Sequence, residues 1–359
     1  MSLLRPIAVV LGCAVLTTGA VAQVSLTPPA AQAQAGKPAA KKEEPKPAPK
    51  PKAAAEKKQA GPKPAPAPTP SPSPTHPFDD PNVDLVYGAY QRGLYKTAFD
   101  LATNRANFAR DPKAMTMLGE LYANGLGVKR DYGKAVEWYQ RASDAGDREA
   151  MFALAMMRLA GRGGAVNKEE AVKLLASSAK LGNPKAAYNL ALLYLDGQTL
   201  PQDLTRCAEL LRMAADAGSP EAQYALATFY KEGTGVPKDL ERSVRLLQAA
   251  SLADNVDAEV EYAIALYNGS GTPRNQPAAV ALLRKAARQN SPIAQNRLAR
   301  VLATGQGVPQ DKVEALKWHT VAKTAGKGDP ELDEILLDMS PQDRAKAEAG
   351  ARKWLGTGK

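Results

Sequence analysis

The sequence has few of the residues that catalytic and metal sites use. Its 359 residues include only two histidines and two cysteines. It has no His-x-x-x-His, no cysteine pair at metal-binding spacing and no Gly-x-Ser-x-Gly motif, whereas catalysis needs a convergent set of titratable groups. We therefore expect no enzymatic activity, no small-molecule substrate, and neither a metal nor another cofactor.

Long apolar runs are missing as well. The run from Pro6 to Leu16 is shorter than the roughly 20 apolar residues that a helix needs to span a bilayer, and no later segment qualifies. This run follows Arg5 and precedes Ala20-Val21-Ala22, the pattern of a cleavable secretory signal over residues 1–22. The sequence therefore predicts an exported protein, periplasmic or secreted.

Two alternatives concern the same segment. An uncleaved signal would anchor the protein in the inner membrane, and Val10-Leu11-Gly12-Cys13 loosely resembles a lipobox that would place a lipid on Cys13. Cleavage after Ala22 leaves Cys207 as the single cysteine, which excludes an internal disulfide even in an oxidising compartment.

Bulky apolar residues are nearly absent from residues 23–77, which consist mainly of Pro, Ala, Lys and Gln. Such a composition cannot bury a core, so we expect a disordered, Pro-rich linker. Its nine lysines and three glutamates give +6, and Arg5 adds +1, so the chain's +10 leaves only +3 for residues 78–359. The basic charge thus belongs to the linker and not to a folded face, which excludes nucleic acid as a partner. Contact with a membrane would be peripheral at most.

What the chain does contain is a repeat with a period of 36 residues, found without a gap. Six copies fill residues 111–326, as 111–146, 147–182, 183–218, 219–254, 255–290 and 291–326. The period is visible in one alanine and one glycine per copy: Ala114, Ala150, Ala186, Ala222, Ala258, Ala294, and Gly125, Gly161, Gly197, Gly233, Gly269, Gly305.

Each copy carries the residues that start and stop two helices. A side chain that can accept a hydrogen bond from a free helix N–H opens the first helix, and in four copies a proline follows it at the first helical position. These cap positions are Asp111, Asp147, Asn183, Ser219, Asn255 and Ser291. The first helix runs for about 13 residues to the repeat glycine, which stops it in the left-handed conformation.

The second helix of each copy is bounded in the same way. It starts at a second set of capping residues, Asp131, Asn167, Asp203, Asp239, Asn275 and Asp311. It ends at residues that tolerate positive φ, namely Gly146, Gly182, Gly218, Asp254, Asn290 and Gly326. Such pairs cannot bury an apolar face alone, so the sequence predicts an all-α fold, an α/α solenoid or superhelix in which neighbours stack. We expect capping helices at 78–110 and one capping helix with a tail at 327–359.

The segments Ala114–Val128 and Asp131–Ala142 closely resemble the Sel-one-like repeat family, a branch of the tetratricopeptide-type solenoids. The resemblance covers residues 111–326 and implies a scaffold that binds proteins in signalling or envelope assembly, where some exported members restrain a membrane sensor kinase. Some cysteine-rich relatives bind or cleave β-lactams, but this chain lacks their repeated cysteine pairs. Thr199, Tyr262 and Thr272 depart from the pattern and are expected to loosen individual turns.

The few reactive residues have structural explanations. Cys207 stands where other repeats have alanine or serine, and His319 stands where they have tyrosine or leucine, so both are expected in the core. The glycine pairs, such as Gly233 and Gly235, recur with the repeat and follow no strand, which disfavours nucleotide binding.

One face of the first helices is the candidate partner site. If the repeat alanine is position 0 and each residue advances 100°, positions +2, +6 and +9 share the face opposite the core. In such solenoids this face lines the concave groove, and buried aromatic anchors there carry interface energy. The candidate residues are Phe152, Met156, Leu159, Tyr188, Leu192, Leu195, Tyr224, Thr228, Lys231, Val260, Ile264 and Tyr267.

Two alternatives remain open from the sequence. These side chains could pack on the next repeat instead of facing a partner. The array could also bind cell-wall or other polysaccharide, held away from the membrane by its linker. The sequence favours a protein partner, either a peptide segment or a domain of an envelope protein, because the predicted groove is apolar and bears tyrosines.

Overall fold

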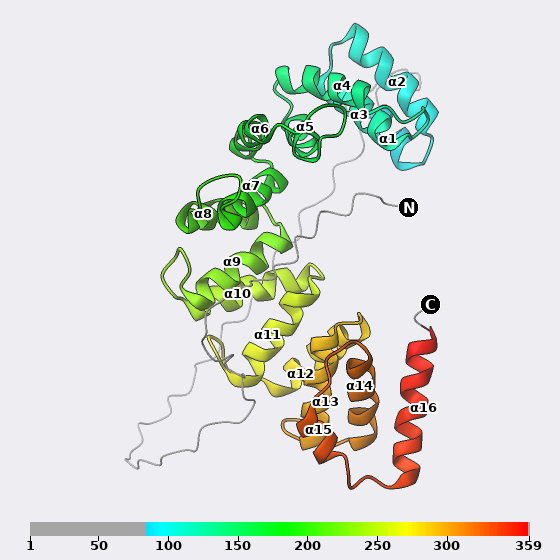
Figure 1. Ribbon diagram of the computed structural model, residues 1–359, viewed down its shortest axis with the longest axis vertical. Coiled ribbons are helices and arrows are strands. Elements are labelled where there is room, and N and C mark those ends of the chain that lie inside the picture. The colour runs from blue at the N-terminus through cyan, green and yellow to red at the C-terminus, as the bar shows by residue number, and fades with distance from the viewer. Residues whose placement is uncertain (1–83, 358–359) are drawn as a thin grey trace, which may run out of the picture. The chain divides into compact units, whose positions relative to one another are not determined.

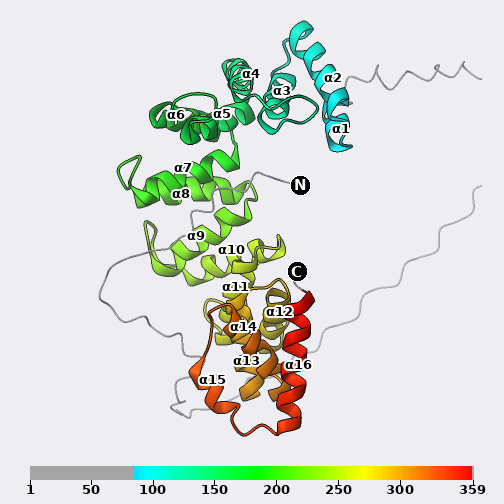
Figure 2. The ribbon, with the colours of Figure 1, turned by 45° about the vertical axis from the view of Figure 1, so that its right-hand side comes forward.

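The computed structural model describes residues 84–357, which form sixteen α-helices in consecutive pairs (Figures 1 and 2). The six repeats supply the first helices α3 (Pro112–Asn124), α5 (Arg148–Ala160), α7 (Pro184–Asp196), α9 (Pro220–Glu232), α11 (Val256–Asn268) and α13 (Pro292–Thr304). The second helices are α4 (Tyr132–Asp144), α6 (Lys168–Lys180), α8 (Leu204–Asp216), α10 (Leu240–Leu252), α12 (Gln276–Arg288) and α14 (Lys312–Thr324). The predicted helical solenoid is confirmed.

The predicted helix starts are confirmed at all twelve positions. Every capping side chain accepts a hydrogen bond from a backbone N–H two or three residues ahead, as Asp147 Oδ1 does from Ala150 N at 2.7 Å. These bonds satisfy N–H groups that have no partner inside the helix. Each repeat helix therefore begins where its cap stands.

The helix ends also follow the sequence. The repeat glycine that stops each first helix has a left-handed φ, for example +69° at Gly125. At the end of the second helix the non-glycine residues Asp254 and Asn290 adopt φ of +60° and +63°, a conformation that Asp and Asn tolerate. Thr199 coincides with a less regular turn: the cap N–H bond four residues back seen at Gly125 and Gly161 is not formed at Gly197.

The core lies between the helices of a pair and between neighbouring pairs. Each second helix packs against its own first helix and against the first helix of the next repeat. The repeat alanines and the leucines four residues later, such as Leu154 and Leu298, are fully buried. Gly119 replaces alanine in the first repeat because a Cβ there would come within 2.6 Å of the Tyr139 ring. Cys207 and His319 are buried, as expected.

Helices also flank the repeats at both ends. The N-terminal pair is α1 (Leu85–Gln91) and α2 (Tyr95–Phe108). At the C-terminus the sequence predicted one capping helix, and the structure has two. The expected helix is α16 (Pro341–Thr357), and the short helix α15 (Pro330–Ile335) precedes it. The sequence does contain a start signal for α15, because Asp329 caps this helix and Pro330 follows, as at the start of a repeat. Helix α16 packs on α14, where the rings of Trp318 and Trp354 meet in a T-shaped arrangement with centroids 5.2 Å apart.

The predictions for the secretory signal, the linker and residues 78–83 lie outside the described residues. Between residues 84 and 357, no helix combines the length and the apolar character needed to cross a membrane.

Candidate partner-binding surface

The candidate residues lie in a row on the first helices α5, α7, α9 and α11. Ten of the twelve are accessible in part or in full. Nine are half-buried: Phe152, Met156, Leu159, Tyr188, Leu192, Leu195, Tyr224, Thr228 and Ile264; Lys231 is exposed. We call these ten side chains the first-helix surface.

Two of the candidate residues, Val260 and Tyr267, do not belong to it. Val260 is 4% exposed and Tyr267 is 2% exposed, so neither presents area to a partner. The Tyr267 hydroxyl lies 3.2 Å from the carbonyl oxygen of Gln306 in the turn of the next repeat. The helical angle alone placed both side chains outward, but both are buried, and Tyr267 contacts the next repeat.

The open alternative, packing between repeats, accounts for part of the surface. Phe152, Leu159, Tyr188 and Leu195 pack against the buried cluster that joins repeats two to four, and Tyr224 packs against the next cluster. These side chains are therefore anchored at one edge and accessible at the other. An anchored aromatic loses little conformational entropy when it meets a partner, which suits it to recognition.

The tyrosines of the surface remain neutral hydrogen-bond donors. Burial raises the pKa of Tyr224 to about 12, and the carboxylates of Glu261 and Asp257 add to the shift. Burial also raises the pKa of Tyr188. Each hydroxyl therefore keeps its proton at neutral pH.

The sequence reasoning missed position +3, which is half-buried in every repeat and lies beside +6 on the helix. Its residues are Met117, Ala153, Asn189, Ala225, Glu261 and Arg297. An angle of 300° is close enough to the 240° of position +6 to have indicated this. The row is apolar or amide as far as Ala225 and charged beyond it.

The charged end of the face is fastened to its neighbours. Lys231 Nζ lies 2.7 Å from Glu261 Oε2 in the next repeat. Arg300 and Asn296 both bond to Asp329, the cap of α15. These contacts show that first-helix side chains reach the following first helix.

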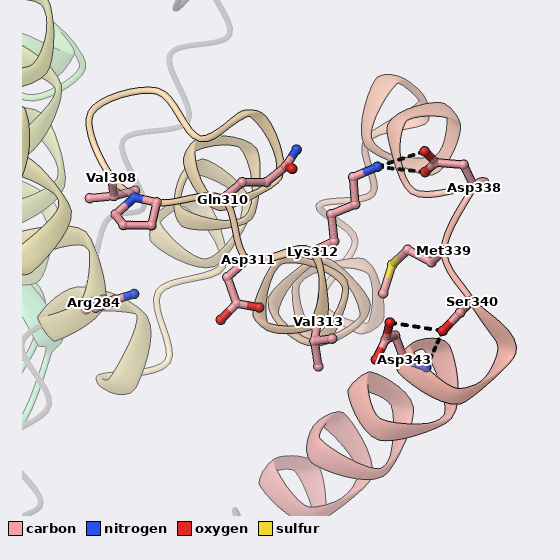
Figure 3. Close-up of a pocket in the computed structure, with 11 residues that line it drawn as sticks. Arg284, Val308, Gln310, Asp311, Lys312, Val313, Asp338, Met339, Ser340 and Asp343 are labelled. Carbon is pink, nitrogen blue, oxygen red and sulfur yellow. Dashed lines mark hydrogen bonds and ion pairs between the residues drawn. The ribbon is translucent and has the colours of Figure 1, made fainter.

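A separate recess of about 670 Å³ lies near the C-terminal end (Figure 3). It is lined by residues of the α13–α14 turn, the start of α14 and the α15–α16 turn. Lys312 points toward Asp338 and bonds to it at 2.8 Å, and Asp343 bonds to Ser340 at 2.9 Å. The Lys312–Asp338 pair thus fastens the α15–α16 turn to α14. Residues 84–357 contain no group of three His, Cys, Asp or Glu side chains that could hold a metal ion.

Comparison with known proteins identifies the repeat. The family model described as the Sel1 repeat matches residues 112–147, 148–183, 184–219, 220–255, 256–291 and 292–327. These matches have the same period as the predicted copies and begin one residue later. No curated protein sequence matches the chain.

Several solved structures are similar to the chain, and two of them illustrate the match. One is a protective antigen of uropathogenic Escherichia coli that displays an SLR fold; the match has 25% identity and a TM-score of 0.65, and covers 77% of this chain and 61% of that one. This chain therefore spans less than two thirds of that antigen. The other is a Sel1 repeat protein from Oxalobacter formigenes, with 27% identity, a TM-score of 0.59, and coverage of 67% of this chain and 98% of that one.

Proposed function

The chain belongs to the Sel1-repeat family, and we propose that it is a non-enzymatic scaffold that binds a partner protein through the first-helix surface. Sel1-repeat proteins are generally protein-interaction modules. The partner is a peptide segment or a domain of an envelope protein, and the complex serves signalling or envelope assembly outside the cytoplasm. The signal pattern of residues 1–22 motivates this location.

One observation carries the proposal. Met156, Leu192 and Ile264 occupy position +6 in three repeats and remain half-accessible on one face, with Tyr188 and Tyr224 beside them. A row of apolar side chains with tyrosine donors provides desolvation energy and orientation, the combination on which protein interfaces depend. A polysaccharide-binding role is the competing function that the test must exclude.

The test uses paired substitutions to glutamate. Leu192→Glu places a charge in the first-helix surface, whereas Met213→Glu changes an exposed apolar residue of α8, 46% accessible, on a second helix. A photo-crosslinker at position 192 in growing cells should give a protein adduct that mass spectrometry identifies. Purified, that partner should bind wild-type and Met213→Glu protein equally and Leu192→Glu at least tenfold more weakly.

Circular dichroism must show that both variants keep their helix content. Equal partner binding by Leu192→Glu would overturn the surface assignment. Polysaccharide binding would be favoured by two results together. The protein would cosediment with purified cell-wall sacculi equally well with and without Leu192→Glu, and no protein adduct would form.

A further inference from the structure

One half-buried cation on the first helices of the repeats has no ion pair, hydrogen bond or aromatic ring as a partner. The described residues contain eight half-buried lysines and arginines. Seven of them have an ion pair, a hydrogen bond or a tryptophan ring: Arg158, Arg284, Lys285, Arg300, Lys312, Lys317 and Arg344. Arg297, on α13, has none, although a half-buried charge without a partner is costly.

The repeat explains why this arginine is unpaired. At the junction of repeats four and five, Lys231 at position +9 pairs with Glu261 at position +3 of the next repeat. At the junction of repeats five and six the corresponding residues are Tyr267 and Arg297. The Tyr267 hydroxyl bonds to Gln306. Arg297 therefore has no counterpart of the Lys231 side chain that pairs with Glu261 one repeat earlier.

The carboxylates close to Arg297 are already engaged. Glu261 and Asp329 both act on its charge from neighbouring elements. Glu261 pairs with Lys231, and Asp329 accepts hydrogen bonds from Arg300 and Asn296. Arg300, three residues along the same helix, adds repulsion, and burial together with this repulsion lowers the pKa of Arg297.

We propose that Arg297 receives a carboxylate of the partner segment that occupies the first-helix surface. A guanidinium holds a carboxylate through two parallel hydrogen bonds, and a partly desolvated site strengthens them. The partner is thus a protein segment whose apolar side chains lie over Met156, Leu192 and Ile264 and whose acidic group follows them toward repeat six. This inference rests on the proposed function, because it assigns the end of the same surface.

The binding test selects peptides from a phage-displayed random library on the full chain. Wild-type protein should enrich peptides that combine apolar residues with an aspartate, a glutamate or a free C-terminus. Arg297→Gln should weaken the best peptide at least tenfold, whereas Arg288→Gln, which removes the same charge from an exposed residue of α12, should leave its affinity within twofold.

Two changes in the peptide identify the source of the carboxylate. Replacing its acidic side chain with the amide tests one source, and amidating its C-terminus tests the other. The change that removes the responsible carboxylate should weaken binding to wild-type protein but have no further effect on Arg297→Gln, because the pair is already broken.

A stability measurement separates recognition from a structural role. Because Arg297 is half-buried and unpaired, Arg297→Met should raise the melting temperature by about 2 °C. Arg300→Met, which breaks an ion pair, should lower it. A fall in melting temperature with Arg297→Met would overturn the proposal, as that result would reveal a stabilising partner.

The outcomes distinguish this inference from the proposed function. Selected peptides without a carboxylate, or equal affinity for wild-type and Arg297→Gln protein, would overturn the role of Arg297 alone. Binding that survives Leu192→Glu but not Arg297→Gln would overturn the first-helix surface and leave the arginine site.

Discussion

Repeats two and three are joined to their neighbours differently from repeats four to six. Every ion pair with both residues in repeats two and three stays within one repeat, as Arg158–Glu170 does. From repeat four onward ion pairs cross the junctions: Lys231–Glu261, Lys285–Asp254, Arg284–Glu314, Arg300–Asp329 and Lys312–Asp338.

The difference shows that one framework supports two kinds of surface. Where no ion pair crosses between the repeats, the first-helix side chains at position +9 are half-open and uncharged, as at Leu159 and Leu195. In repeats four and five the same position +9 is paired or buried, as at Lys231 and Tyr267. Repeats two and three thus form the more open part of the first-helix surface, and the ion pairs of repeats four to six hold the end of the array in place.

The largest predicted effect tests what the two regions share. Leu154 and Leu298 occupy the same repeat position and are both fully buried, so Leu154→Ala and Leu298→Ala should each destabilise the fold by about 2–5 kcal/mol. Urea unfolding monitored by circular dichroism measures the loss. A cost confined to one variant would show that the cores of the regions differ as well as their junctions.

The next effect is restricted to the end of repeat six, where an ion pair crosses the junction. Asp329 has a 6% exposed side chain and pairs with Arg300, so Arg300→Met should cost on the order of 2 kcal/mol by leaving a buried carboxylate without its cation. Hydrogen exchange should then quicken in α15 and α16. Lys173→Met removes an exposed pair with Glu169 in repeat two and should leave exchange unchanged, since such pairs contribute little.

Acid should produce a smaller, graded effect on the same region. Hydrogen bonds from His319 and Lys323 lower the pKa of Asp333, and one from Lys312 lowers that of Asp338. Burial opposes the shift at Asp329, but bonds from Arg300 and Asn296 still lower its pKa. A carboxyl whose folded pKa is depressed stabilises above its ordinary pKa, and this contribution is lost as pH falls.

Below about pH 4, hydrogen exchange should therefore rise in α13–α16 before it rises in α5–α8. Simultaneous loosening of both regions would mean that the junction charges do not govern the acid response.

The smallest expected effect is in repeat three, which no ion pair joins to its neighbours. Cys207, in α8, is fully buried, and burial raises the pKa of its thiol to about 12. Since only the thiolate reacts, labelling by iodoacetamide should require opening of repeat three. At 1 M salt, where exposed charges are screened, labelling should keep its low-salt rate while exchange quickens in α15 and α16. If 1 M salt accelerated the labelling of Cys207, junction ion pairs would not be what distinguishes repeats four to six from repeats two and three.

The repeat made most of the fold predictable. Asp254 and Asn290 were assigned to helix ends although four other repeats have glycine there, because these side chains also tolerate positive φ. Helix α15 was missed because Asp329 stands two residues beyond the repeat register, although Asp-Pro is the same start signal.

The candidate site was less predictable. The helical angle gave the correct face for Met156 and Leu192 but the wrong exposure for Val260 and Tyr267. An angle describes one helix, whereas exposure depends on the next helix. Arg297 was overlooked because its lack of a partner depends on where Lys231, Tyr267 and Arg300 direct their side chains.

The sequence by itself determined the period, the helix boundaries and the buried alanine and leucine positions, since each depends on a cap, a stop or a spacing within one repeat. Only the tertiary structure decided which first-helix side chains stay accessible and which charges are paired. Those properties arise between repeats, where residues 30 or more positions apart meet, as Lys231 and Glu261 do.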